Sequence, residues 1–209
     1  MLILASASPR RRELLAQAGY SFEVHPAHIP EEPYPNEDPI AYVTRLAREK
    51  AQAVFNEIMG LPDPDYQTGK FTKTLANDQR ASAAPQVLGA DTTVALDDHI
   101  LGKPESPTDA ARMLRLLSGR THRVLTGVAL INATSIQVAA ESTAVQFLTL
   151  SDEEIGAYIA TGEPMDKAGA YAIQGRAARW IPRIEGCYFN VVGLPIALVS
   201  SLLGARPAR

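Results

Sequence analysis

The sequence predicts an α/β fold in which a mixed sheet is flanked by helices, and three observations lead to this prediction. Apolar runs that are typical of buried strands alternate with helical patterns in the first part of the chain. An apolar stretch at residues 87–96 then indicates a long central strand, and two more strand-like stretches follow at 124–132 and 137–148. Strands that first alternate with helices and then follow one another directly are typical of a sheet with both parallel and antiparallel pairs.

The first elements are expected to be a strand, a helix and a second, short strand. Residues 2–5 are apolar and predict a buried strand. Ser8 suits the N-cap position of a helix, and Pro9 suits its first turn, where a missing N–H costs nothing. We therefore expect a helix over residues 9–18, and residues 21–24 alternate as a strand would.

Capping signals and turn residues place the remaining elements. Asp38 and Pro39 predict the start of a helix that continues to about residue 59. Ser151 and Glu154 predict a capping box at the start of another helix. The other expected elements are a strand at 99–101, a helix that begins at 106–107, a hairpin of strands 179–184 and 187–192, and a last helix at 195–203.

Two segments are expected to lie outside the folded core. Residues 60–85 carry Pro62 and Pro64 and show no periodicity, which predicts an exposed excursion. Residues 204–209 are expected to be a frayed tail. The length allows one generous domain or two small lobes, and we expect residues 1–209 to form a single domain.

Composition narrows the class of protein. The chain is 46% hydrophobic, which favours a folded globule, and 20 basic residues against 23 acidic ones argue against a broad nucleic-acid footprint. Cys187 is the only cysteine, so no internal disulfide can form, and we expect a packed thiol in a reducing compartment. The sequence shows neither a signal peptide nor an apolar stretch of membrane length, which predicts a cytoplasmic protein.

The start of the first helix carries three arginines in its first turn, where cations oppose the helix dipole. This placement is understandable if an anion binds there, because backbone N–H groups, serine hydroxyls and guanidinium groups together suit a polyphosphate. The candidate ligands are Ser6, Ser8, Arg10 and Arg11. The alternative is that the arginines, Arg12 included, are solvated on an ordinary surface helix.

A lysine lies within the apolar stripe of the second helix. The stripe consists of Ile40, Val43, Leu46, Ala47, Ala51, Val54 and Ile58. At about 100° per residue, Lys50 falls between Val43 and Val54 on this face. A lysine there is costly unless it snorkels to solvent or meets an anion. Lys50 is therefore either a snorkelling residue or, as we expect, a phosphate ligand in a cleft.

Asp91 interrupts the apolar central strand. A carboxylate there must accept hydrogen bonds, bind a cation or titrate abnormally, and the two small residues before it leave open space. Asp91 is thus either a structural aspartate or a functional one. Lys103 lies in a turn between a glycine and a proline, where a lysine is usually solvated. Beside Lys50 and Arg10, it becomes a third candidate ligand for phosphate.

Nine short segments together carry a family resemblance. They are 5–15 (ASASPRRRELL), 45–51 (RLAREKA), 89–92 (GADT), 102–104 (GKP), 117–122 (LSGRTH), 161–164 (TGEP), 166–171 (DKAGAY), 173–175 (IQG) and 190–195 (NVVGLP). Each segment alone is weak, but in this order they are highly specific. From Leu2 to about Leu203, the chain resembles the Maf family of nucleoside triphosphate pyrophosphatases.

The resemblance implies an enzyme that cleaves a nucleoside triphosphate between its α and β phosphates, giving a monophosphate and pyrophosphate. It also implies an elongated Maf/ITPase-like fold with two lobes around a nucleotide cleft, and a homodimer. By resemblance, Asp91 is the proton acceptor that activates water, and Glu31 and Asp91 are ligands for Mg²⁺ or Mn²⁺. The family often has Asp-Glu where this chain has Pro30-Glu31, so Glu32 is a candidate for the missing carboxylate. The alternative is that Glu31 and Glu32 belong to a merely charged, proline-rich loop.

Two subgroups of the family differ at the positions that match Thr92 and Gln174. Thr and Gln are typical of the subgroup that acts on dTTP and UTP, whereas Gln and Glu are typical of the subgroup that acts on 7-methyl-GTP. By resemblance, this chain falls in the first subgroup, and Arg10 is a third specificity residue. A Gln amide offers both a donor and an acceptor to the edge of uracil or thymine. The alternative for Gln174 is an ordinary hydrogen-bonded polar residue.

A second function stays open, namely a nucleotide-binding regulator of cell division with little catalysis. The combination of Glu31, Lys50, Asp91 and Lys103 favours catalysis, since binding alone would not need all four. The sequence lacks a Walker-type phosphate loop, which argues against a P-loop ATPase or kinase. Zinc-ligand spacing is also missing among the histidines, which are His25, His28, His99 and His122.

Overall fold

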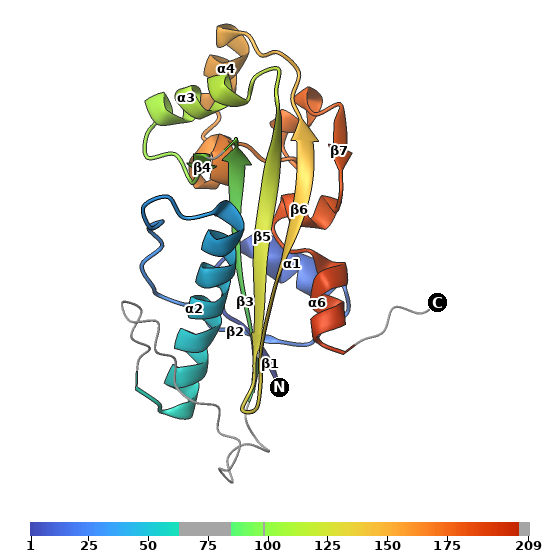
Figure 1. Cartoon of the computed structure of the whole chain (residues 1–209). Helices are drawn as coiled ribbons and strands as arrows, with labels where there is room; N and C mark the ends of the chain where they lie inside the picture. Colours follow the sequence, from blue (N-terminus) through green and yellow to red (C-terminus); the bar gives the residue numbers. More distant parts are fainter. Residues whose placement is uncertain (63–84, 98, 205–209) are drawn as a thin grey trace.

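The computed structural model describes residues 1–62, 85–97 and 99–204 (Figure 1). Within these residues, seven strands form one mixed sheet in the order β2-β1-β3-β5-β6-β7, and β4 pairs with β3. The predicted α/β class with a mixed sheet is therefore confirmed. Most of the expected excursion at 60–85 and of the expected tail at 204–209 lies outside the described residues.

The elements alternate early and crowd together later, as expected. Their bounds are β1 (Leu2–Leu4), α1 (Pro9–Gln17), β2 (Glu23–Val24), α2 (Pro39–Met59), β3 (Gln86–Leu96), β4 (His99–Leu101), α3 (Pro107–Leu117), β5 (Thr121–Ile131), β6 (Ile136–Gln146), α4 (Asp152–Ile159), the 3₁₀ helices η2 (Glu163–Asp166), η3 (Ala168–Ala170) and η4 (Arg176–Trp180), β7 (Arg183–Glu185), α5 (Tyr188–Val192) and α6 (Ile196–Leu202).

Three long strands, β3, β5 and β6, run the length of the molecule (Figure 1). They pair antiparallel, whereas β1 pairs parallel with both β2 and β3. In the β3–β5 register, Asp91 lies directly opposite Gly127, which has no side chain to fill the space beside the carboxylate. The middle of β3 is therefore a buried strand with room at one position.

The edge of β3 that faces β1 and β4 has a gap. β1 pairs with residues 86–88 of β3, and β4 pairs with residues 94–96 on the same edge. No described strand pairs with residues 89–93 there. A sheet edge without a neighbour leaves backbone groups for other partners, and Asp91 lies in the middle of this gap.

Helix α2 packs closely on one face of the sheet. A Cβ atom added to Gly89 or Gly127 would lie 2.1 Å from a backbone oxygen of α2, so only glycine fits at these two positions. Asp38 caps the helix as predicted, accepting from two backbone N–H groups. The predicted apolar stripe is wrong at its ends, because Ile40 and Ile58 are 42% and 39% exposed.

Two lobes share the long strands (Figure 1). In one, α1, α5 and α6 cover the opposite face from α2, and their apolar side chains meet Leu88 and Leu130. In the other, α3, α4 and the 3₁₀ helices enclose a second core around Leu114, Phe147 and Trp180. Among the described residues, we find no helix long and apolar enough to cross a membrane.

The expected hairpin of strands 179–184 and 187–192 is wrong. Its first part contains η4, whose Trp180 is buried, and only Arg183–Glu185 is a strand, paired with β6. Its second part is α5, in which Asn190 is fully buried and donates to Val124 O and Thr143 Oγ1. These tertiary contacts override the strand propensity of the apolar and β-branched residues.

Candidate functional site

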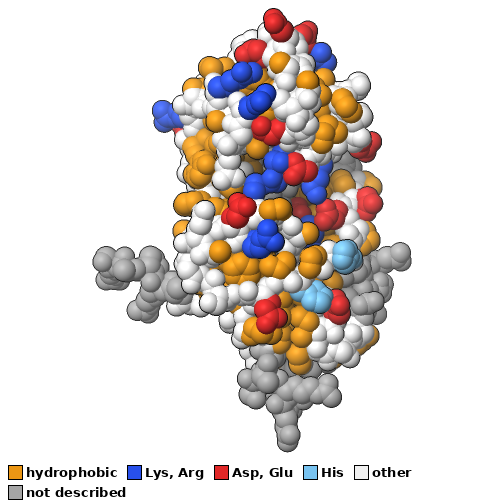
Figure 2. Space-filling model, turned by 180° about the vertical axis from the view of Figure 1, so that it is seen from behind, with side chains coloured by type: hydrophobic (Ala, Val, Ile, Leu, Met, Phe, Trp, Pro, Cys, Tyr) orange, Lys and Arg blue, Asp and Glu red, His pale blue; other side chains and the backbone are white. Residues whose placement is uncertain are grey.

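A cleft of about 630 Å³ opens at the gap in the edge of β3, and every residue that the sequence predicts for the site lines it. These residues are Ser6, Ser8, Arg10, Arg11, Glu31, Glu32, Lys50, Asp91, Thr92, Lys103 and Gln174. On the face opposite to that of Figure 1, charged side chains of both signs gather across the middle of the molecule (Figure 2). The fold thus brings together residues that are far apart in the sequence.

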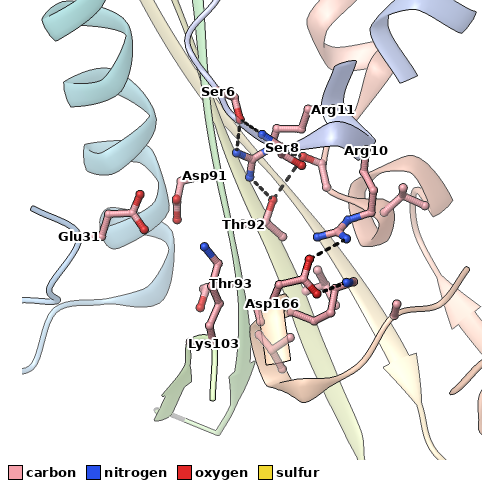
Figure 3. Close-up of a pocket in the computed structure, with 18 of the residues that line it drawn as sticks. Ser6, Ser8, Arg10, Arg11, Glu31, Asp91, Thr92, Thr93, Lys103 and Asp166 are labelled. Carbon is pink, nitrogen blue, oxygen red and sulfur yellow. Dashed lines mark hydrogen bonds and ion pairs between the residues drawn. The ribbon is translucent and has the colours of Figure 1, made fainter. Parts of the chain in front are cut away.

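One end of the cleft, the carboxylate end, consists of Glu31, Lys50 and Asp91. Lys50 Nζ lies 2.6 Å from Asp91 Oδ1 and 2.7 Å from Glu31 Oε1. Figure 3 shows the carboxylates of Glu31 and Asp91 on neighbouring sides of one space. The Lys50 and Asp91 side chains are 9% and 10% exposed, whereas that of Glu31 is 49% exposed. Lys50 therefore does meet anions in the apolar stripe, but in this structure they are carboxylates.

Charge at this end keeps Glu31 ionised. Burial alone would raise the pKa of Glu31, but the hydrogen bond and the charge of Lys50 hold it below its ordinary value, helped by Lys103 and Arg11. Lys103 is an exposed residue just after β4, and it lines the cleft as predicted. The two carboxylates therefore face a strongly positive surrounding.

The loop that carries Glu31 is anchored by α2, which sequence reasoning did not foresee. The Tyr42 hydroxyl donates to Glu31 O at 2.8 Å, and Arg45 Nη2 donates to Glu32 O at 3.1 Å. Arg45 also pairs with Glu37 at 2.7 Å and stacks on the Tyr34 ring at 4.1 Å. Two signals were available: Arg45 opens the matching segment 45–51, and both Tyr42 and Arg45 precede Lys50 on the same helix.

The carboxylate end fits a divalent cation only when further ligands are present. The contacting oxygens of Glu31 and Asp91 converge on one point, the Lys50 ammonium group. Among the residues that the structure describes, no cluster of three or more His, Cys, Asp or Glu side chains could hold a metal ion. Two carboxylates that need phosphate oxygens to complete the shell are typical of Mg²⁺ sites in nucleotide enzymes.

Arg11 does not project into solvent, so the interpretation of a solvated surface arginine is wrong for this residue, while its predicted contact with phosphate stays a prediction. Its guanidinium group donates to Ala90 O at 2.8 Å, Gly193 O at 2.9 Å, Thr92 Oγ1 at 2.9 Å and Ser6 Oγ at 3.1 Å. Burial lowers the pKa of Arg11, and the nearby charge of Asp91 opposes this shift. Arg11 thus fills the gap in the sheet edge and satisfies a β3 carbonyl that β1 does not reach.

The serines at the helix start also differ from expectation. Ser8 occupies the N-cap position of α1, but its hydroxyl makes no capping hydrogen bond in the described structure. Its backbone N–H donates to Ser6 Oγ at 3.3 Å, and Ser6 is buried. Both serines line the cleft next to Arg11 (Figure 3), where their predicted contact with phosphate stays a prediction.

Thr92 points to the opposite face of β3 from Asp91. Its hydroxyl accepts from Arg11, lies 2.9 Å from Thr126 Oγ1 and contacts Gly193 O at 3.3 Å. The residue therefore belongs to the network that holds Arg11. A direct contact between Thr92 and a nucleobase stays a prediction.

The other end of the cleft, the Gln174 end, is formed by Ala172, Ile173 and Gln174 after η3. Gln174 is exposed. Elsewhere in the cleft lining, Arg10 Nη1 lies 3.7 Å from Asp166 Oδ2, and Asp166 also pairs with Lys167 (Figure 3). Asp166 and Lys167 lie within a matching segment of the sequence, but the sequence gave them no role there.

Several known proteins are similar to this chain over almost its whole length. A dTTP/UTP pyrophosphatase of Koribacter versatilis is 50% identical over 202 residues, which cover 97% of this chain and 92% of the relative. Proteins of the same name from Moorella thermoacetica and Thermococcus onnurineus are 50% and 46% identical, over 97% of this chain and 93% and 96% of their own lengths.

The sequence profile of the family described as "Maf-like protein" matches residues 1–206. This range contains every residue that lines the cleft. The resemblance seen in the nine segments is thereby confirmed over nearly the whole chain, and the protein belongs to the Maf-like family.

Proposed function

We propose that this protein is a pyrophosphatase that hydrolyses dTTP and UTP to the nucleoside monophosphate and pyrophosphate. One observation carries the proposal: a buried carboxylate, Asp91, lies beside a lysine in a cleft at an open sheet edge. The names of the similar proteins support the same activity. Modified pyrimidine nucleotides belong to the same substrate class.

The reaction needs a water molecule, a base and charge neutralisation. The water oxygen attacks the α phosphorus while its proton passes to the carboxylate of Asp91. The bond from the α phosphorus to the α–β bridging oxygen breaks, and pyrophosphate leaves with the electron pair. Lys50, Lys103 and Arg10 would stabilise the charge on the phosphates, as positively charged groups do in other phosphoryl transfers.

Glu31 and Asp91 would hold Mg²⁺ or Mn²⁺ together with oxygens of the bound triphosphate. The ion would supply further neutralisation of phosphate charge when it is bound. Because the described protein groups offer two carboxylates rather than a complete shell, we expect weak metal binding in the absence of nucleotide. Isothermal titration of Mn²⁺ into the protein, with and without a non-hydrolysable dTTP analogue, measures this difference.

The activity is tested by a panel of dTTP, UTP, ATP, GTP and 7-methyl-GTP with Mg²⁺, in water labelled with ¹⁸O. We expect pyrophosphate as the product, the label in the monophosphate, and faster turnover of dTTP and UTP. The Asp91→Asn variant, purified in the same way, controls for contaminating phosphatases. Release of a diphosphate, or label in the pyrophosphate, would contradict attack at the α phosphorus. Tight binding without turnover would support a regulator instead.

We also propose a single-domain homodimer in the cytoplasm. The family profile spans nearly the whole chain, which supports one domain. Light scattering during size-exclusion chromatography measures the mass in solution, for which a chain of 22.5 kDa gives the reference. Cell fractionation measures the compartment.

A further inference from the structure

The Gln174 end of the cleft is a β-turn. Gly175 N–H donates to Ala172 O at 3.0 Å, so Ile173 and Gln174 are the two central residues of the turn. Both line the cleft, and Gln174 is exposed. The direction of the Gln174 side chain therefore depends on how the backbone of residues 172–176 is held.

A buried tyrosine, Tyr158, and a partly buried glutamate, Glu163, hold this backbone at both ends of the turn. The Ala172 N–H donates to Tyr158 Oη at 3.3 Å, before the turn. The Arg176 N–H, after the turn, lies 3.1 and 3.3 Å from the two carboxylate oxygens of Glu163. Tyr158 Oη in turn donates to Glu163 Oε1 at 2.8 Å, so the two anchors form one unit.

The packing around this unit leaves it little freedom. Tyr158 is 1% exposed, and its ring packs edge-on against Trp180 with centroids 5.1 Å apart. A Cβ atom on Gly175 would lie 1.9 Å from Glu163 Oε1, so the carboxylate sits directly against the turn. The pKa of Tyr158 is raised, first by burial and then by its hydrogen bond to Glu163, which keeps the hydroxyl a donor.

We propose that Tyr158 and Glu163 are positioning residues that fix the turn at 172–176 and thereby determine how selectively Gln174 reads the nucleobase. The inference rests on the proposed function, because it takes Gln174 as a contact to the base. The inference adds two residues, Tyr158 and Glu163, that need not touch the substrate. Their effect should be on the choice between nucleotides rather than on the chemistry at Asp91.

The test is the ratio of kcat/KM for dTTP to kcat/KM for GTP in Tyr158→Phe, Glu163→Ala, Glu163→Gln and Gly175→Ala. The wild type should prefer dTTP over GTP by about ten- to a hundredfold. We expect this ratio to fall by about three- to tenfold, mainly through a higher KM for dTTP, in Tyr158→Phe, Glu163→Ala and Gly175→Ala. Glu163→Gln keeps an acceptor oxygen and should recover part of the ratio. Gly175→Ala should act like Glu163→Ala, because the added methyl group displaces the carboxylate.

The matched control is Tyr42→Phe, which removes a similar hydroxyl-to-backbone bond from the loop that carries Glu31. It should lower kcat for both nucleotides and leave their ratio unchanged. Amide hydrogen exchange gives a second measurement, in which Ala172 and Arg176 should exchange faster in Tyr158→Phe and Glu163→Ala. This readout remains available if a variant loses activity.

The outcomes separate the inference from the proposed function. If Gln174→Glu changes the ratio while Tyr158→Phe and Glu163→Ala leave it unchanged, the inference is overturned and the proposed function stands. If the wild-type protein hydrolyses no nucleotide, the proposed function fails. Binding of dTMP and GMP by calorimetry then replaces the kinetic ratio, and an unchanged binding preference in Tyr158→Phe and Glu163→Ala would overturn the inference on its own.

Discussion

The two ends of the cleft are built from different kinds of structure. The carboxylate end takes Lys50 from a long helix and Asp91 from a central strand, and both side chains are buried. The Gln174 end takes its side chains from a turn between 3₁₀ helices. We infer that the chemical step common to all substrates depends mainly on a helix and a strand, which carry Lys50 and Asp91, while Glu31 is added from a loop that α2 anchors. Discrimination between substrates lies on a turn whose position a few hydrogen bonds determine.

The largest effect that this comparison predicts comes from Asp91. Asp91→Asn should lower kcat by about 10²–10⁴ for every nucleotide while leaving nucleotide binding largely intact, because a general base is lost. Asp97→Asn is the matched control, since Asp97 follows the same strand but pairs with Arg120 at the surface. Steady-state kinetics measure kcat, and calorimetry measures nucleotide binding, for both variants. Near-normal turnover of Asp91→Asn would make Asp91 structural.

The variant Lys50→Met tests how much the ion pairs at the carboxylate end contribute to the free energy of unfolding. From the apolar stripe alone, Lys50→Met should leave stability unchanged or improved. The observed ion pairs predict the opposite, because removing one partner of a buried pair costs about 3–5 kcal/mol. Denaturant unfolding measures the loss, and Lys50→Met with Asp91→Asn should recover part of it.

The control for Lys50 is Lys103→Met. Lys103 is exposed at the other side of the same carboxylates, so this change should weaken nucleotide binding with little effect on unfolding. Equal stability of Lys50→Met and the wild type would mean that the ion pairs contribute nothing net to the fold.

Gly127 tests whether the carboxylate end depends on the close approach of α2. In Gly127→Ala, the new methyl group would lie 2.1 Å from Val43 O, so α2 must move away from β5. We expect a loss of about 1–3 kcal/mol in stability and lower kcat for all nucleotides alike. Gly156→Ala is the control, because a Cβ there meets nothing within 4 Å. A change in nucleotide preference in Gly127→Ala would argue against the division between the two ends.

The smallest effect is expected at the Gln174 end. Gln174→Glu should reduce the preference for dTTP and UTP over GTP by about ten- to a hundredfold, since a carboxylate only accepts hydrogen bonds and repels a carbonyl oxygen. The turnover rate with the best substrate should change less than in Asp91→Asn. A wild-type enzyme that prefers 7-methyl-GTP would refute the specificity assignment and leave the pyrophosphatase proposal in place.

Sequence reasoning worked best where one residue contradicts its surroundings. Lys50 in an apolar helix face and Asp91 in an apolar strand are local conflicts that periodicity alone reveals. They turn out to be partners, 2.6 Å apart. The capped starts of α2 and α4 were also predictable from the local sequence, because the capping residues lie next to the helices that they stabilise.

Sequence reasoning failed where distant partners decide the structure. The contacts of Arg11 to the carbonyls of Ala90 and Gly193 could not be foreseen, because both residues lie far from it in the sequence, and its predicted contact with phosphate stays a prediction. The helix α5 looked like a strand, because the contacts of Asn190 to β5 and β6 are not visible in its neighbours. Glu163 lies in the matching segment 161–164, but nothing there indicated its pairing with Tyr158, since the backbone partners of the pair lie 13 and 14 residues further along the chain.

The continuity of β3 has a consequence for how the enzyme meets its substrate. β3 pairs with β5 without interruption from Val87 to Ala95 and contributes side chains to the cores of both lobes. A motion of one lobe against the other would have to bend this ladder rather than turn about a flexible linker. We therefore expect closure around a nucleotide to be smaller than in enzymes whose lobes share no strand, with more of the adjustment made by the loops at the rim of the cleft.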